Sequence, residues 1–191
     1  MKNIKTASLV RIALLMAVTV LLAATPLGYI YIPVIGLSYT IMVLPVAVGG
    51  VLMGIPTGLL LGLTFGITSL IKAPTEALGQ LLLGYSPLVT VIICIVPRVL
   101  VGLVAGLFGK WTAKNDNIAL YAVAGCACSL TNTLLFVGLV YIFCHSLVEG
   151  AFGVLVWSST LIGGLGEAVL AALLCALVLK PLGKILKKSK I

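Results

Sequence analysis

The chain has 191 residues, of which 62% are hydrophobic and only 8% are charged. Its mean hydropathy of +1.32 lies far outside the range of soluble domains, so the composition excludes a soluble enzyme or binding domain. A chain of this length holds about six membrane spans of ~20 residues with short loops, which leaves no room for a separate soluble domain. We therefore expect a single all-α integral membrane domain over residues 1–191.

Six apolar segments of helix length follow one another along the chain. The predicted helices cover residues 9–25, 38–53, 57–72, 87–109, 118–144 and 154–180. Two connections, 26–37 and 73–86, are longer than a plain turn and still fairly apolar. The first helix has a basic start, but LLAATPLG lacks the usual small-x-small cleavage pattern, so we expect the helix to stay in the chain.

The basic residues predict how the chain lies in the membrane. The formal net charge of +8 would by itself fit nucleic-acid binding. With both termini in the cytoplasm, however, ten of the twelve Lys and Arg residues fall on the cytoplasmic side, while Lys72 lies outside and Arg98 lies within the membrane. This is the positive-inside pattern. The charge therefore indicates a topology and no nucleic-acid partner, and the lysine-rich end of the chain is interpreted as a contact for anionic lipid in the bilayer.

Sequence motifs for catalysis or metal binding are absent. The five cysteines lie in apolar helix sequence, and an odd number without a CxxC pair favours packing over disulfides or a zinc site. No intramembrane Ser and His pair and no paired acids mark a catalytic site, and Gly109-Lys110 lacks the rest of the phosphate-binding P-loop pattern. We therefore expect no enzyme activity, no metal and no cofactor, and any ATP hydrolysis would take place in another chain.

Glycines recur every four residues in the second, third and fourth predicted helices and in the turn between the first two of these. They are Gly50, Gly54, Gly58, Gly62, Gly66, Gly102 and Gly106. Small residues four apart let helix backbones approach closely in lipid. We expect these glycines to pack the three helices against one another within the chain.

Three predicted helices each carry one strongly polar residue near mid-span, namely Arg98, Asn132 and Glu167. At ~1.5 Å per residue they lie ~16–21 Å from the starts of their helices, and so at similar depth. Polar residues inside a bilayer are costly and by default mark a functional site. We predict that the three meet in the bundle interior and bind a substrate there. A purely structural ion pair between Arg98 and Glu167 is the alternative.

Further candidate binding residues lie toward the outer ends of the helices. Thr160 falls within ~40° of Glu167 on the helical wheel and extends the polar track outward. Trp157, Tyr39 and Tyr85 are placed to cover a ligand, although an interfacial aromatic belt explains them equally well. The guanidinium of Arg98 offers a planar fork of donors for a carboxylate or an amide, or a flat face for stacking on a ring.

An ordered set of motifs runs from about residue 9 to 180. It comprises ALLMA at residues 13–17, then TIMVLPVAVGGVLMG, LLLGLTFGITSLI, PRVLVGLVAGL, SLTNTLLFVG and GEAVLAAL. In this order, and above all through VPR, TNT and GEA in the last three helices, the chain resembles the substrate-binding S component of an energy-coupling factor (ECF) vitamin transporter. The resemblance implies a six-transmembrane-helix bundle in the bacterial cell membrane with both termini cytoplasmic, matching the topology predicted from charge.

The same resemblance implies a transport mechanism. Members of the family bind a vitamin in an outward-opening pocket built from helices four to six and capped by the loops after helices one and three. They have no ATPase of their own, and Ala13 and Ala17 match the surface that docks on the transmembrane T subunit. That subunit connects to two cytoplasmic ATPase subunits, and the loaded S component is thought to topple within the membrane before release inside.

The vitamin is predicted from the pocket charge and from the overall resemblance. A single arginine suits an anionic ligand, and the chain looks most like the pantothenate-type and related folate-type members, so pantothenate is the predicted substrate. Folate, riboflavin, cobalamin and a pyrimidine or pyridoxine precursor remain open. The alternative function is a scaffold or assembly subunit of a larger membrane complex or, at a further remove, an enzyme acting on lipids.

Overall fold

The structure, a computed structural model, describes the backbone of residues 6–32, 37–145 and 151–188. Its helices are α1 (Thr6–Ala24), α2 (Val43–Met53), α3 (Ile55–Lys72), α4 (Ala77–Tyr85), α5 (Pro87–Lys114), α6 (Ile118–Phe143) and α8 (Ala151–Lys188). Two strands, β1 (Tyr29–Ile32) and β2 (Leu37–Thr40), form an antiparallel hairpin between α1 and α2.

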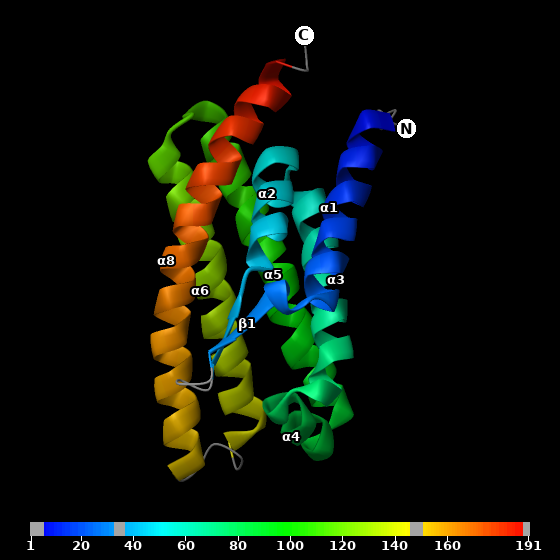
Figure 1. The fold of residues 1–191 in the computed structure, drawn as a ribbon, viewed down its shortest axis with the longest axis vertical. Coiled ribbons are helices and arrows are strands. Elements are labelled where there is room, and N and C mark those ends of the chain that lie inside the picture. Colours follow the sequence, from blue (N-terminus) through cyan, green and yellow to red (C-terminus); the bar gives the residue numbers. More distant parts are fainter. Residues whose placement is uncertain (1–5, 33–36, 146–150, 189–191) are drawn as a thin grey trace.

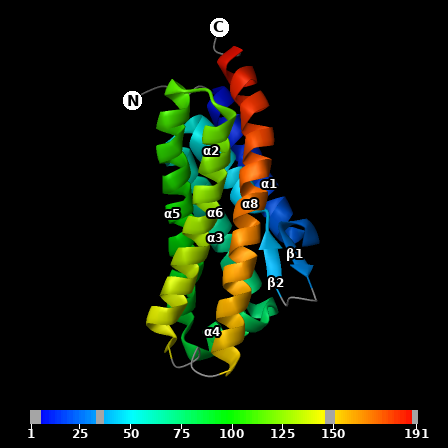
Figure 2. The ribbon, with the colours of Figure 1, turned by 90° about the vertical axis from the view of Figure 1, so that its left-hand side faces the viewer.

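The long helices run along one axis and form a bundle (Figure 1). The start of α1 and the end of α8 lie at the same end of this bundle, and α4 lies at the opposite end. In the perpendicular view the hairpin lies beside α8, on the side of the bundle away from α5 (Figure 2). Strand β2 contacts α8 directly.

Within the described residues, five helices are long and apolar enough to cross a membrane by length and composition. They are α1, α3, α5, α6 and the Gly163–Ile185 part of α8. Helix α2 is also apolar but has only 11 residues. At ~1.5 Å per residue it covers about half of a ~30 Å hydrocarbon core. The six predicted spans therefore correspond to five long helices and one half-length helix.

The predicted boundaries are wrong mainly between residues 26 and 42. Helix α2 starts at Val43 rather than at residue 38, because Leu37–Thr40 forms strand β2 and pairs with β1 from Tyr29↔Thr40 to Ile32↔Leu37. A short apolar run with aromatic and β-branched residues fits a strand as well as a helix, so hydropathy alone did not separate the two. The all-α expectation consequently missed this hairpin.

Other boundaries also differ from the prediction, among them the end of α5, which reaches Lys114 rather than residue 109. The expected connection 73–86 contains helix α4, which lies between two prolines, Pro74 and Pro87, and is too short to stand out by periodicity. At the other end of the chain, α8 runs over Ala151–Lys188 rather than 154–180, and Pro181 lies inside it. Helix α6 matches its predicted range to within one residue.

Glycines bring α3 and α5 into backbone contact, as predicted. A Cβ atom on Gly58 would collide with the carbonyl oxygen of Gly102, and a Cβ on Gly102 would collide with that of Gly58. A Cβ on Gly62 would likewise collide with the carbonyl oxygen of Arg98. Gly54 belongs to the same four-residue series for another reason, because it ends α2 with φ 93°, a left-handed conformation that glycine adopts without strain.

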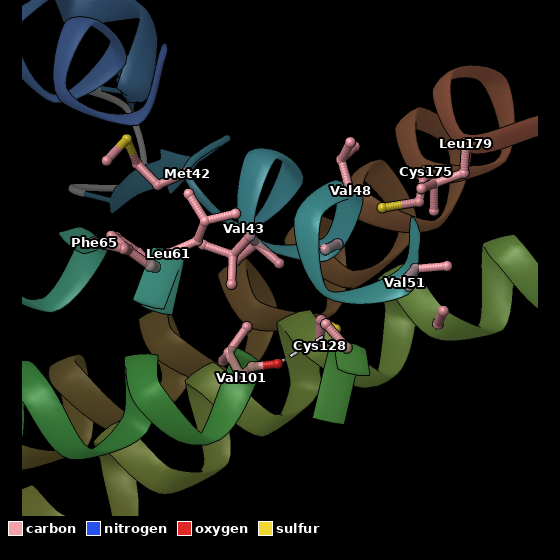
Figure 3. Packing of buried hydrophobic residues seen from close by; sticks show 14 of the residues in the cluster. Met42, Val43, Val48, Val51, Leu61, Phe65, Val101, Cys128, Cys175 and Leu179 are labelled. Carbon is pink, nitrogen blue, oxygen red and sulfur yellow. Dashed lines mark hydrogen bonds between the residues drawn. The ribbon is translucent and has the colours of Figure 1, made fainter. Parts of the chain in front are cut away.

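The largest hydrophobic cluster joins α2 and α3 to α5, α6 and α8 (Figure 3). Met42, Leu61 and Phe65 fill one side of it, and Cys128 and Cys175 lie on the other. The Cys128 thiol lies 3.9 Å from the carbonyl oxygen of Val101, so α6 packs directly on α5 at this level. The expectation that cysteines serve as packing residues holds for these two, which are fully buried.

Candidate functional site

Arg98 is a buried cation near the middle of α5. Its side chain is 8% exposed, and its Nη1 donates a hydrogen bond of 2.8 Å to the carbonyl oxygen of Ile93 in the same helix. The guanidinium carbon lies 5.5 Å from the ring centroid of Phe65 on α3 and 5.1 Å from that of Phe136 on α6. Both distances are within the range of cation–π attraction. Three helices therefore fix the position of this charge.

Glu167 on α8 anchors the hairpin. Its Oε1 accepts a hydrogen bond of 2.8 Å from the backbone N–H of Thr40, the last residue of β2. The hydroxyl of Thr40 donates in turn to the carbonyl oxygen of Gly28 at 3.3 Å and accepts from the N–H of Met42 at 3.3 Å. The carboxylate thus holds the point where the hairpin returns to the helical bundle.

Arg98 on α5 and Glu167 on α8 carry opposite charges, and the positive charge of Arg98 favours the ionised form of the Glu167 carboxylate. The Oε1 atom of this carboxylate accepts its hydrogen bond from the backbone N–H of Thr40. Sequence patterns did not reveal this role of Thr40, because the donor is a backbone N–H that any residue at position 40 except proline would supply.

Asn132 on α6 is buried at 6% exposure, one helical turn from Phe136, which contacts Arg98. Its Oδ1 has no hydrogen-bond partner in the part of the chain that the structure describes, and the same holds for the buried Oγ of Ser129 one turn earlier. Buried polar groups ordinarily have partners. Ser129 was not predicted, because a serine in an apolar helix usually bonds to a backbone carbonyl one turn back and attracts no notice in the sequence.

Helix α6 packs against both α5 and α8. Its contact with α8 is close near the site, because a Cβ on Gly164 would lie 2.6 Å from Cγ2 of Thr133. The mid-span residues predicted from the sequence are therefore carried by α6 and by the two helices packed against it, with Phe65 and Thr40 as additions from α3 and β2. Such a site combines one fixed cation, one carboxylate and two uncommitted polar oxygens.

Of the remaining predicted binding residues, the structure describes the side chain of Tyr85 and only the backbone of the other three. Tyr85 ends α4, and half of its surface is exposed. The backbone of Tyr39 lies in β2, and the backbones of Trp157 and Thr160 lie in α8. The side chains of these last three lie outside the described residues.

Ala13 and Ala17 lie on the outward face of α1. Both are exposed, as is Leu14 between them, with 64% of its surface accessible. Leu21 on the same helix is 62% exposed. In the described chain, α1 thus presents an apolar surface with small residues at the predicted docking positions.

Comparisons with known proteins give two results. Residues 7–182 match the family described as "ECF transporter, substrate-specific component". The chain is also 26% identical over 155 residues to the "Pantothenic acid transporter PanT" of Lactococcus lactis subsp. cremoris (strain MG1363). That alignment covers 76% of this chain and 78% of the relative.

Proposed function

Because the chain belongs to the family of ECF transporter substrate-specific components, we propose that it captures a small carboxylated vitamin for uptake, and that the vitamin is pantothenate. The chain itself is a multi-pass membrane protein that binds substrate rather than an enzyme. The observation that carries the proposal is the buried guanidinium of Arg98, held by a carbonyl oxygen and two aromatic rings. The likeness to a pantothenic acid transporter supports the choice of vitamin.

The chemistry of pantothenate fits the groups around Arg98. The vitamin has a carboxylate at one end, an amide in the middle and two hydroxyls at the other end. A carboxylate would pair with the planar donor fork of the guanidinium, since charge-assisted pairs of this kind are the strong ones. The amide and hydroxyls would then supply donors to Asn132 Oδ1 and Ser129 Oγ, the two buried oxygens without a partner in the described chain.

In this proposal Glu167 does not bind the ligand directly, because its carboxylate would repel the carboxylate of the vitamin. Glu167 instead accepts the hydrogen bond of Thr40 and so holds the hairpin beside the site. The hairpin then forms one wall of the binding site. Tyr39, Trp157, Thr160 and Tyr85 complete the proposed ligand contacts toward the outer surface.

The partners follow from the family. We propose that a transmembrane T subunit binds the exposed face of α1 at Ala13 and Ala17, where small side chains permit a close helix contact. Two ATPase subunits attached to that T subunit would supply the energy. The single domain would span the bacterial cell membrane six times, counting α2, with both termini in the cytoplasm as the positive-inside rule requires.

The function is tested with two ligands that differ in one group. Isothermal titration of the purified protein with pantothenate should give tight binding. Its alcohol analogue, which has a hydroxymethyl in place of the carboxylate, should bind roughly 100-fold more weakly or worse, because it lacks the charged acceptor for Arg98. Equal affinity for the two would show that Arg98 does not read a carboxylate.

A panel of other vitamins distinguishes the remaining substrates. Folate, riboflavin, cobalamin and pyrimidine or pyridoxine precursors are titrated under the same conditions. Tight binding of one of these, with none of pantothenate, would replace the substrate and keep the transport function. Binding of none of them would favour the scaffold or assembly function instead.

A further inference from the structure

Proline lies next to the buried cation in the middle of α5. Pro97 is inside the helix and fully buried, and Arg98 follows it. In an α-helix the N–H of residue 97 would donate to the carbonyl oxygen of residue 93. Proline has no N–H, so this carbonyl is released from the helical ladder.

The released carbonyl is the one that Arg98 uses. The guanidinium Nη1 donates to Ile93 O at 2.8 Å, across five residues of the same helix. Helical side chains point back toward the N-terminal end, so an arginine following a proline is directed at the carbonyl that the proline has left open. Pro97 thus leaves the carbonyl oxygen of Ile93 without its helical donor, and Arg98 supplies a donor for the same oxygen.

The contact matters because the site is buried. A charge in such a place requires hydrogen-bond partners, and an acceptor already engaged by an N–H is a weaker partner than one that is not. The bond to Ile93 O also sets where the guanidinium lies between Phe65 and Phe136.

We infer that Pro97 is a positioning residue for ligand binding: by withholding its N–H, it makes Ile93 O available to fix the guanidinium of Arg98 in the orientation that receives an anionic ligand. The inference rests on the proposed function for its effect on affinity. It goes beyond that function by assigning a role to a residue that has no polar side chain. The alternative is that the proline ring serves only to bend α5.

Two replacements separate the missing N–H from the ring. Pro97→Ala removes the ring and adds the N–H. The α-hydroxy acid counterpart of alanine, introduced at position 97 by nonsense suppression, also removes the ring but places an ester oxygen where the N–H would be. If the missing N–H is what matters, the alanine variant should bind pantothenate about tenfold more weakly, while the ester variant should bind close to native protein. Pro181→Ala is the matched control, since it is another helix-interior proline and is exposed near the end of α8.

Native affinity in the alanine variant would overturn the inference. Equal loss in the alanine and ester variants would also overturn it, because it would assign the effect to the ring. Failure of the unmodified protein to bind pantothenate would instead count against the proposed function.

A second measurement needs no ligand. The sequence has two arginines, Arg11 and Arg98, so protein labelled with 15N-arginine gives few side-chain signals. A guanidinium fixed by Ile93 O rotates slowly and shows separate Nη signals. We expect the two Nη signals of Arg98 to merge in the Pro97→Ala protein and to stay apart in the ester variant, with Arg11 unchanged. Separate signals in both variants would overturn the positioning role even if the ligand is not pantothenate.

Discussion

The two sides of α5 are packed by different means. Toward α3, glycines allow backbone to meet backbone, with Gly58 against Gly102 and Gly62 against the carbonyl oxygen of Arg98. Toward α6, the helix presents the charged guanidinium of Arg98, which lies 5.1 Å from the ring centroid of Phe136, and Asn132 lies one helical turn from Phe136 on the same helix. One side is closed and neutral, and the other holds charge and uncommitted hydrogen-bonding atoms.

The difference shows how the rigid side positions the functional side. Gly62 lets α3 approach the backbone of Arg98, and Phe65, three residues further along α3, then reaches the guanidinium. Close-packed helices have little freedom to shift, because neighbouring atoms already occupy the space. The glycine contact therefore supports the geometry of the cation without touching a ligand.

The largest expected effect is on ligand binding and comes from the charged side. Arg98→Ala should weaken pantothenate binding by ~2–5 kcal/mol, because it removes a buried charge-assisted contact and leaves the opposite charge unpaired. Arg98→Lys should rescue poorly, since a point charge does not reproduce the planar fork. Isothermal titration in detergent measures both.

A double variant decides whether Arg98 is a structural partner of Glu167. Replacing both charges together, by Arg98→Met and Glu167→Leu, removes an electrostatic pair without leaving one charge alone. If Arg98 binds the ligand, the double variant should fold but should bind pantothenate more weakly than the native protein. Native affinity in this variant would remove Arg98 from the binding site.

The next effect is on stability and comes from the glycine side. Gly102→Ala should destabilise the fold by about 1–3 kcal/mol, because the added methyl collides with the backbone of Gly58 and the helices must separate. Gly138→Ala is the matched control on α6, where an added Cβ meets nothing within 4 Å. Thermal unfolding followed by fluorescence-detected gel filtration should show a lower midpoint for the first variant and an equal or higher one for the second. Equal midpoints would show that the α3–α5 contact has room to relax.

The sequence predicted the parts of this molecule that follow from regular periodicity and from the cost of polar groups in lipid. The apolar lengths of α5 and α6, the glycine contact and the burial of Arg98 and Asn132 all depend on such rules. The hairpin and α4 did not follow, because each is short and its pattern fits more than one structure.

Contacts between distant backbone and side-chain atoms were also beyond prediction. The bond from Thr40 N–H to Glu167 joins residues 127 positions apart, and nothing in either local sequence indicates it. The bond from Arg98 to Ile93 O is local, but it depends on a side-chain direction that hydropathy does not encode. Ser129 could be recognised as a candidate only from the structure, because the burial of its hydroxyl without a partner in the described chain cannot be read from the sequence.

The smallest expected effect concerns the hairpin and links it to the charged side. Glu167→Leu removes the acceptor for Thr40 N–H, which is a partly buried hydrogen bond to a charged group, and should destabilise local closure of β2 by about 1–2 kcal/mol. Glu167→Gln keeps an oxygen acceptor at the same position and removes the charge. Hydrogen–deuterium exchange of the backbone amide of Thr40 should therefore be faster by roughly five- to thirtyfold in the leucine variant and nearly native in the glutamine variant. Fast exchange in both variants would mean that charge, and not the acceptor geometry, holds the hairpin, whereas native exchange in both would show that β1 pairing alone keeps β2 in place.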